Sequence, residues 1–127
     1  MLKQSKAIKL CLLILVVFAL AGCSGGSYRI SVGDIKSLDN TISGSYRSFS
    51  GYYFKEVKLK KGQTVMFSIT STTEKGELGA KVIDSQGKTI LEIKKDESLN
   101  IGKSDTYKIQ VEGKEHKGNF ELSWKVQ

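Results

Sequence analysis

Apolar and polar residues alternate along three stretches of the chain, at residues 64–70, 106–112 and 119–127. A period of two is typical of a β-strand with one face in a core and the other in water. The positions expected on the buried faces are Val65, Phe67, Ile69, Tyr107, Ile109, Val111, Phe120, Leu122, Trp124 and Val126. Less regular patterns predict further strands at 28–32, 44–49, 52–60, 78–84, 88–94 and 98–101. The chain therefore predicts an all-β, antiparallel sandwich.

Turn residues separate these strands at the spacing of an all-β fold. The predicted breaks are Lys60–Gln63, Asp84–Lys88, Gly102–Asp105 and Gly113–Gly118. Within the second of these, Gly87 is expected to take the left-handed conformation that closes a type I turn.

The N-terminus carries a different pattern, in which Lys3, Lys6 and Lys9 precede an uncharged apolar run from Leu10 to Leu20. A transmembrane helix needs about 20 apolar residues. This run is shorter, so it is expected to be the helical part of an export signal rather than a permanent anchor. Its removal would leave 105 residues with 17 basic and 13 acidic groups, a net charge of +4 instead of the +7 of the whole chain. A body of that size forms one modest domain.

The end of the run, Leu20-Ala21-Gly22-Cys23, resembles the lipobox of bacterial lipoproteins. The resemblance implies that the Cys23 thiol receives a diacylglyceryl group and that the signal is cut between Gly22 and Cys23. Two or three acyl chains anchor a protein stably, whereas one does not. The alternative is an ordinary secretory signal with an incidental cysteine.

The cysteines agree with this interpretation, since the chain has only Cys11 and Cys23. Cys11 would leave with the signal and Cys23 would be lipidated, so the mature domain would have no disulfide and no thiol ligand or nucleophile. We expect a signal peptide at 1–22, a lipidated Cys23 with a flexible Gly/Ser tether through residue 27, and a β-sandwich domain at 28–127.

Four segments of the body resemble the bacterial pre-peptidase C-terminal domain. Residues 62–69 (GQTVMFSI) are similar to its Gly-Asp-x-x-x-Phe-x-hydrophobic strand, and 77–87 (ELGAKVIDSQG) to its Asp-Leu hairpin. Residues 106–111 (TYKIQV) and 118–124 (GNFELSW) look like its two last strands. The resemblance implies a jelly-roll-like sandwich with a non-catalytic role. Some relatives bind calcium, but Asp34, Asp39 and Asn40 lack a calcium-loop signature, so we expect no metal or other cofactor.

Catalytic chemistry finds little support in the sequence. His116 is the only histidine and lies between two predicted turn glycines, so we expect a solvated loop residue. Most of the thirteen carboxylates lie next to a lysine or at outward strand positions. A glycosidase-like pair of acids is the remaining enzymatic alternative, a small hydrolase.

Five aromatic residues crowd into one short segment: Tyr46, Phe49, Tyr52, Tyr53 and Phe54. They form either a platform for sugar rings or peptides, or the core contacts of adjacent strands with some members exposed. Tyr52 and Phe54 cannot share a strand face with Tyr53. Trp124, on the last strand, is expected in the core.

Lysines gather near the same segment, with Lys58 and Lys60 at outward positions beside Lys55 and Lys61. Such a surface could meet anionic lipid or wall polyanions, or it could serve only solubility and edge protection. Export and the modest net charge disfavour nucleic acid as a partner. The candidate binding patch is Tyr46, Phe49, Tyr52, Phe54, Lys58 and Lys60.

Together these features predict a lipoprotein on the outer face of the bacterial cytoplasmic membrane. In a Gram-negative cell, Ser24 would direct it to the outer membrane. The favoured role is a non-catalytic binding or accessory module acting on an envelope protein, glycan or wall polyanion. The alternative is a structural or envelope-stress lipoprotein without a discrete ligand.

Overall fold

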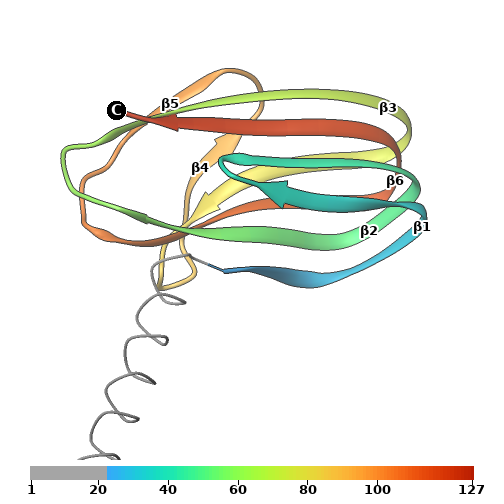
Figure 1. Cartoon of the computed structure of the whole chain (residues 1–127), viewed down its shortest axis with the longest axis horizontal. Coiled ribbons are helices and arrows are strands. Elements are labelled where there is room, and N and C mark those ends of the chain that lie inside the picture. Colours follow the sequence, from blue (N-terminus) through green and yellow to red (C-terminus); the bar gives the residue numbers. More distant parts are fainter. Residues whose placement is uncertain (1–22) are drawn as a thin grey trace, which may run out of the picture.

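The computed structural model describes residues 23–127, which form β-strands joined by short turns (Figure 1). The strands are β1 (Ser24–Leu38), β2 (Thr41–Leu59), β3 (Thr64–Ile83), β4 (Thr89–Ile93), β5 (Glu97–Asn100) and β6 (Asp105–Val126). The signal helix, Cys11 and the lipobox residues before Cys23 lie outside the described part of the chain. No helix within residues 23–127 is long and apolar enough to span a membrane.

All six strands belong to one antiparallel sheet with the order β1-β2-β6-β3-β4, and β5 pairs with the first part of β3. The last strand of the chain, β6, is central, because it pairs with β2 on one side and with β3 on the other. The prediction of an all-β antiparallel sandwich is confirmed.

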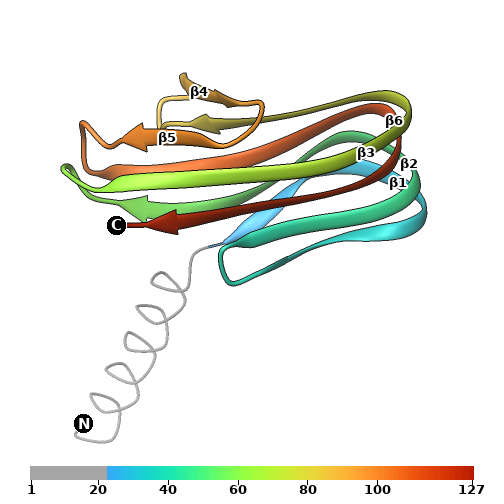
Figure 2. The same ribbon diagram turned by 90° about the horizontal axis from the view of Figure 1, so that it is seen from above.

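The two layers of the sandwich are the two halves of this one sheet, folded over on itself (Figures 1 and 2). β1, β2, β3 and β6 have 15 to 22 residues each, far longer than the usual five or six. Each strand bends in its middle and continues in the other layer. The bends lie together at one end of the molecule and contain bulges in β2 and β3.

We call the half that contains the start of β1 the first layer. It contains residues 24–31 of β1, 49–59 of β2, 105–113 of β6, 77–83 of β3, and β4. The second layer contains the other halves of the four long strands, and β5.

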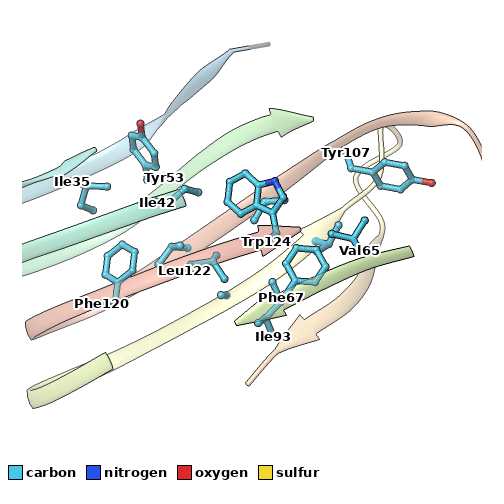
Figure 3. Packing of buried hydrophobic residues seen from close by; sticks show 14 of the residues in the cluster. Ile35, Ile42, Tyr53, Val65, Phe67, Ile93, Tyr107, Phe120, Leu122 and Trp124 are labelled. Atoms are coloured by element: carbon cyan, nitrogen blue, oxygen red, sulfur yellow. The ribbon is translucent and has the colours of Figure 1, made fainter. Parts of the chain in front are cut away.

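The core lies between the layers, where the alternating positions point toward one another (Figure 3). Val65, Phe67, Tyr107 and Leu122 are buried as predicted, and so is Trp124, with 4% of its surface exposed. The Trp124 Nε1–H finds no hydrogen-bond partner among residues 23–127. The sequence therefore predicted the inward faces of three strands correctly.

The predicted flexible tether at residues 24–27 is wrong, because these residues form the start of β1 and pair with Tyr52–Lys55 of β2. A Cβ atom on Gly26 would lie 2.2 Å from the Tyr52 carbonyl oxygen. The glycine thus allows a close approach between two backbones rather than flexibility.

The predicted break at Gly113–Gly118 is also wrong, because β6 runs through it and bends there. Gly118 has a φ of 148°, and a Cβ there would lie 1.8 Å from the Thr72 carbonyl oxygen. The other predicted turns are confirmed, including the left-handed Gly87 with a φ of 84°.

Candidate binding surface

The second half of β2 presents aromatic rings to solvent on the outside of the first layer. Tyr53 and Leu59 point into the core, so Tyr52, Phe54 and Lys58 point outward. Tyr52 is 40% exposed, and its ring stacks on that of Phe54 with centroids 6.4 Å apart and an interplanar angle of 16°. Paired rings of this kind offer a flat apolar surface with a polar edge, which suits binding.

Strands β6 and β3 extend this surface with polar side chains. The outward positions of β6 alternate with the buried Tyr107, Ile109 and Val111. The Lys108 ammonium lies 4.5 Å from the centroid of the Phe54 ring, within the range of a cation–π contact. We call this surface the Tyr52 face; it comprises Tyr52, Phe54, Glu56, Lys58, Lys81, Thr106, Lys108, Gln110 and Glu112.

A hollow of about 660 Å³ opens on the Tyr52 face. Its floor is formed by β2 and β6, and its far rim is the turn Asp84–Gly87 between β3 and β4. Asp84 Oδ1 accepts hydrogen bonds from the amides of Gln86 and Lys88, each at 2.9 Å, and Ser85 Oγ donates to Asp105. These bonds fix the shape of the rim before any ligand arrives.

Two carboxylates beside the hollow, Glu112 and Asp105, are already engaged with neighbours. Glu112 Oε1 lies 2.8 Å from the Lys81 ammonium and accepts a hydrogen bond from Gln110. The Lys81 contact, with that from Gln110, lowers the pKa of Glu112, and the Ser85 hydrogen bonds lower the pKa of Asp105. A general acid at neutral pH needs a raised pKa, so these two groups are unsuited to that role.

Cys23 lies at the edge of the Tyr52 face. Its carbonyl oxygen accepts a hydrogen bond of 2.7 Å from the Glu56 amide, at the end of the paired stretch of β1 and β2. The thiol is exposed, and a hydrogen bond with the Glu56 carboxylate raises its pKa. Because Glu56 also lines the hollow, the cysteine and the hollow share one side of the sandwich.

The residues of the binding patch predicted from the sequence do not all lie on one surface. Tyr52, Phe54 and Lys58 lie together on the Tyr52 face, whereas Lys60 is exposed just beyond the end of β2. Tyr46 and Phe49 are buried, with 6% and 0% exposure, so their assignment to a binding patch is wrong. Both lie where β2 bends between the layers, and their rings pack against each other with centroids 5.3 Å apart.

His116 is also placed differently from the prediction, since it is fully buried inside the bend of β6. Its Nδ1 lies 2.7 Å from the Tyr46 hydroxyl and its Nε2 lies 2.7 Å from the Thr73 hydroxyl. Burial lowers the pKa of His116. The ring therefore joins bends of three strands as a neutral hydrogen-bonding core residue.

Sequence reasoning missed Lys81, Thr106, Lys108, Gln110 and Glu112 as members of the candidate surface. All but Lys81 are polar residues of the alternating stretch 106–112. The alternation predicted that their side chains point outward, but not that they lie beside Tyr52. Their neighbours on β2 depend on the register Glu56↔Lys108 and Phe54↔Gln110. Within residues 23–127, no three His, Cys, Asp or Glu side chains gather in a way that could hold a metal ion.

No family model matches the sequence, and no curated protein is significantly similar to it. Among solved structures, the chain is similar to PliG of Aeromonas hydrophila, a periplasmic inhibitor of g-type lysozyme. That match has 14% identity and a TM-score of 0.50, and it covers 84% of this chain and 88% of the inhibitor. A second match is the CBM22-1 xylan-binding domain of Paenibacillus barcinonensis Xyn10C, with 10% identity, 84% coverage of each chain and a TM-score of 0.43. The likeness to the inhibitor is one of fold.

Proposed function

We propose that this protein is an extracytoplasmic lipoprotein, anchored through Cys23, that acts as a non-catalytic binding or accessory module at the bacterial cell envelope. The observation that carries the binding role is the Tyr52 face. There an exposed tyrosine ring stacked on a half-buried phenylalanine, a cation over the phenylalanine ring and a polar hollow lie together. The fold is compatible with such a role, because the similar structure from Aeromonas hydrophila is that of an exported inhibitor protein.

Two features support lipid attachment at Cys23. The sequence before it has the basic, apolar and small-residue order of a lipoprotein signal. The thiol itself is exposed, so a modifying enzyme can reach it. The expected location is the outer face of the cytoplasmic membrane, or the outer membrane in a Gram-negative cell.

Binding suits the Tyr52 face better than catalysis does. Glu112 is held by Lys81, and Asp105 is held by Ser85. The one histidine is buried in the bend, remote in the sheet register from the hollow. Besides the Glu56 carboxylate, the hollow is lined by an aromatic ring, an ammonium group and side-chain amides, from Tyr52, Lys108, Gln86 and Gln110. Such groups recognise partners by stacking and hydrogen bonding.

The anchor is tested by expressing the full chain and the Cys23→Ala variant in bacteria. We expect the intact mass of the wild-type protein to begin at Cys23 and to include a diacylglyceryl group. The variant should remain an uncut precursor or escape into the medium. A mature protein that begins elsewhere, such as at Tyr28, would refute the anchor.

The binding role is tested with envelope fractions, comparing Tyr52→Ala with Met66→Ala. Met66 is a matched control because it is 49% exposed on the outside of the other layer. Compared without the lipid, the wild type and Met66→Ala are expected to bind isolated membranes or wall material. Tyr52→Ala should bind about tenfold more weakly, which corresponds to roughly 1.4 kcal/mol. If the wild type binds no envelope fraction, a structural lipoprotein without a ligand is the better description.

A further inference from the structure

The start of the sheet determines how an anchored domain can stand on its membrane. Ser24, the residue after Cys23, is already paired with Lys55, and the Cys23 carbonyl is bonded to β2. An extended residue spans at most about 3.6 Å. A lipid on the Cys23 sulfur would therefore hold the sheet against the headgroups, instead of letting it swing on a tether.

The direction of the Cys23 side chain then decides which side faces the lipid. Side chains alternate along β1, so Cys23 shares its side with Ser27 and Arg29. The pKa effect of Glu56 on the thiol indicates the same side, because Glu56 belongs to the Tyr52 face. The attachment point and the Tyr52 face therefore lie on the same outer side of the first layer.

The composition of this side suits the surface of an anionic bilayer. Tyr52 is of the residue type enriched at the headgroup level of membrane proteins, and the Phe54 ring adds the apolar area that interfacial segments insert beside it. Within residues 23–127, Arg29, Lys58 and Lys108 form no ion pair, while Lys81 is neutralised by Glu112. The acids without an ion pair on this side include Glu56 and Glu92, which is paired with Lys81 in the sheet register. Arg29, Lys58 and Lys108 therefore leave this side with a small excess of positive charge.

The outside of the second layer is different. Its outward strand positions are mostly small hydroxyl residues. Its outward charges include two pairs of opposite sign, Asp34 and Lys36 on β1 and Glu121 and Lys125 on β6. Its outward residues include Ser43, Ser45, Met66, Ser68, Thr70, Thr72, Glu121, Ser123 and Lys125. This side lacks both the aromatic pair and the cationic excess.

We propose that the Tyr52 face rests on the bilayer that holds Cys23, with Tyr52 and Phe54 at headgroup depth and Lys58 and Lys108 against anionic headgroups. This inference rests on the proposed lipid anchor and names the membrane surface as the partner of the Tyr52 face. The second layer then faces away from the membrane.

The test uses the full, lipidated chain in liposomes of phosphatidylglycerol and phosphatidylcholine. The lipidated domain has no free thiol, so Lys58→Cys and Lys125→Cys each provide one site for a fluorescent label. The two variants are matched, since each removes one exposed lysine from an outward strand position, on opposite sides of the sandwich. A headgroup spin-labelled lipid quenches labels near the bilayer, and iodide quenches labels in water.

We expect the label at Lys58→Cys to be quenched at least threefold more by the spin-labelled lipid than that at Lys125→Cys, and less by iodide. Pure phosphatidylcholine should reduce the difference. So should 1 M salt, which shortens the screening length from about 10 Å at 0.1 M to about 3 Å. A Tyr52→Ala change in the Lys58→Cys background should also reduce it.

The outcomes separate the two proposals. Equal quenching of both labels on a protein whose mass includes the lipid would overturn the orientation and leave the anchor intact. Stronger lipid quenching at Lys125→Cys would assign the membrane to the opposite side. Protection of Lys58→Cys only after addition of wall polymer would make that polymer the partner instead. A protein without lipid mass would refute the anchor, and the orientation with it.

Discussion

Acidification should destabilise this domain through one residue, His116. The imidazole is fully buried between the Tyr46 and Thr73 hydroxyls, and burial lowers its pKa. In the unfolded chain the same group titrates near the ordinary value of about 6.5. Between these two pKa values the unfolded state binds a proton that the folded state does not, so stability is lost as the pH falls below about 6.5.

The size of the effect follows from the width of the pH window. For each pH unit below the unfolded-state pKa, the free energy of unfolding falls by at most about 1.4 kcal/mol, until the folded-state pKa is reached. From pH 7.5 to pH 5.0 the ceiling is therefore about 2 kcal/mol. For a small domain this corresponds to a fall in Tm of roughly 8–16 °C. Burial also raises the pKa of Tyr46, so its hydroxyl stays neutral throughout the window.

The assay is urea unfolding followed by circular dichroism and Trp124 fluorescence at pH 7.5, 6.0 and 5.0. The His116→Gln variant is the control, because glutamine can hydrogen-bond but does not titrate. His116 is the only histidine, so the variant should lose most of the pH dependence between pH 7.5 and 5.0. An equal loss of stability in both proteins between pH 7.5 and 5.0 would refute the assignment.

Three further changes test the core and the bend. Trp124→Ala should lower the free energy of unfolding by about 3–5 kcal/mol, whereas Trp124→Phe should lower it far less, because this change also removes the unpaired indole N–H. The fluorescence of the wild-type protein should be that of a buried Trp, and an emission maximum typical of Trp in water would contradict this. Gly118→Ala should destabilise the domain by more than 1 kcal/mol in urea unfolding, because of its φ of 148° and the Thr72 carbonyl, and a neutral result would contradict the bend geometry. Tyr53→Phe should cost about 1 kcal/mol by removing the hydrogen bond to Ser37, and unchanged unfolding would show that this bond contributes nothing.

The sequence predicted what depends on local alternation. The inward positions of residues 64–70, 106–112 and 119–127 were identified because a period of two specifies the face of each side chain. It did not predict the bends, because a bulged or bent stretch of a long strand uses the same glycines and polar residues as a turn. His116 and Phe49 were therefore assigned to solvent or to a binding patch, although both lie in the core.

The candidate surface shows the same division. Tyr52, Phe54 and Lys58 could be assigned outward from β2 alone. Their partners Lys108 and Gln110 could not be identified, because pairing across strands depends on register, which the sequence of either strand does not specify. The Gly/Ser stretch at 24–27 was mistaken for a tether because small residues serve flexible linkers and close strand pairing alike.

The central position of β6 affects when the domain can fold. Among the six described strands, the one that completes both layers is the last to be synthesised. Before β6 is made, β2 and β3 lack the neighbour that lies between them in both layers, and pairs such as Thr41↔Ser123 join distant parts of the chain. Such non-local topology folds slowly. Neither layer can therefore form completely until β6 has been synthesised.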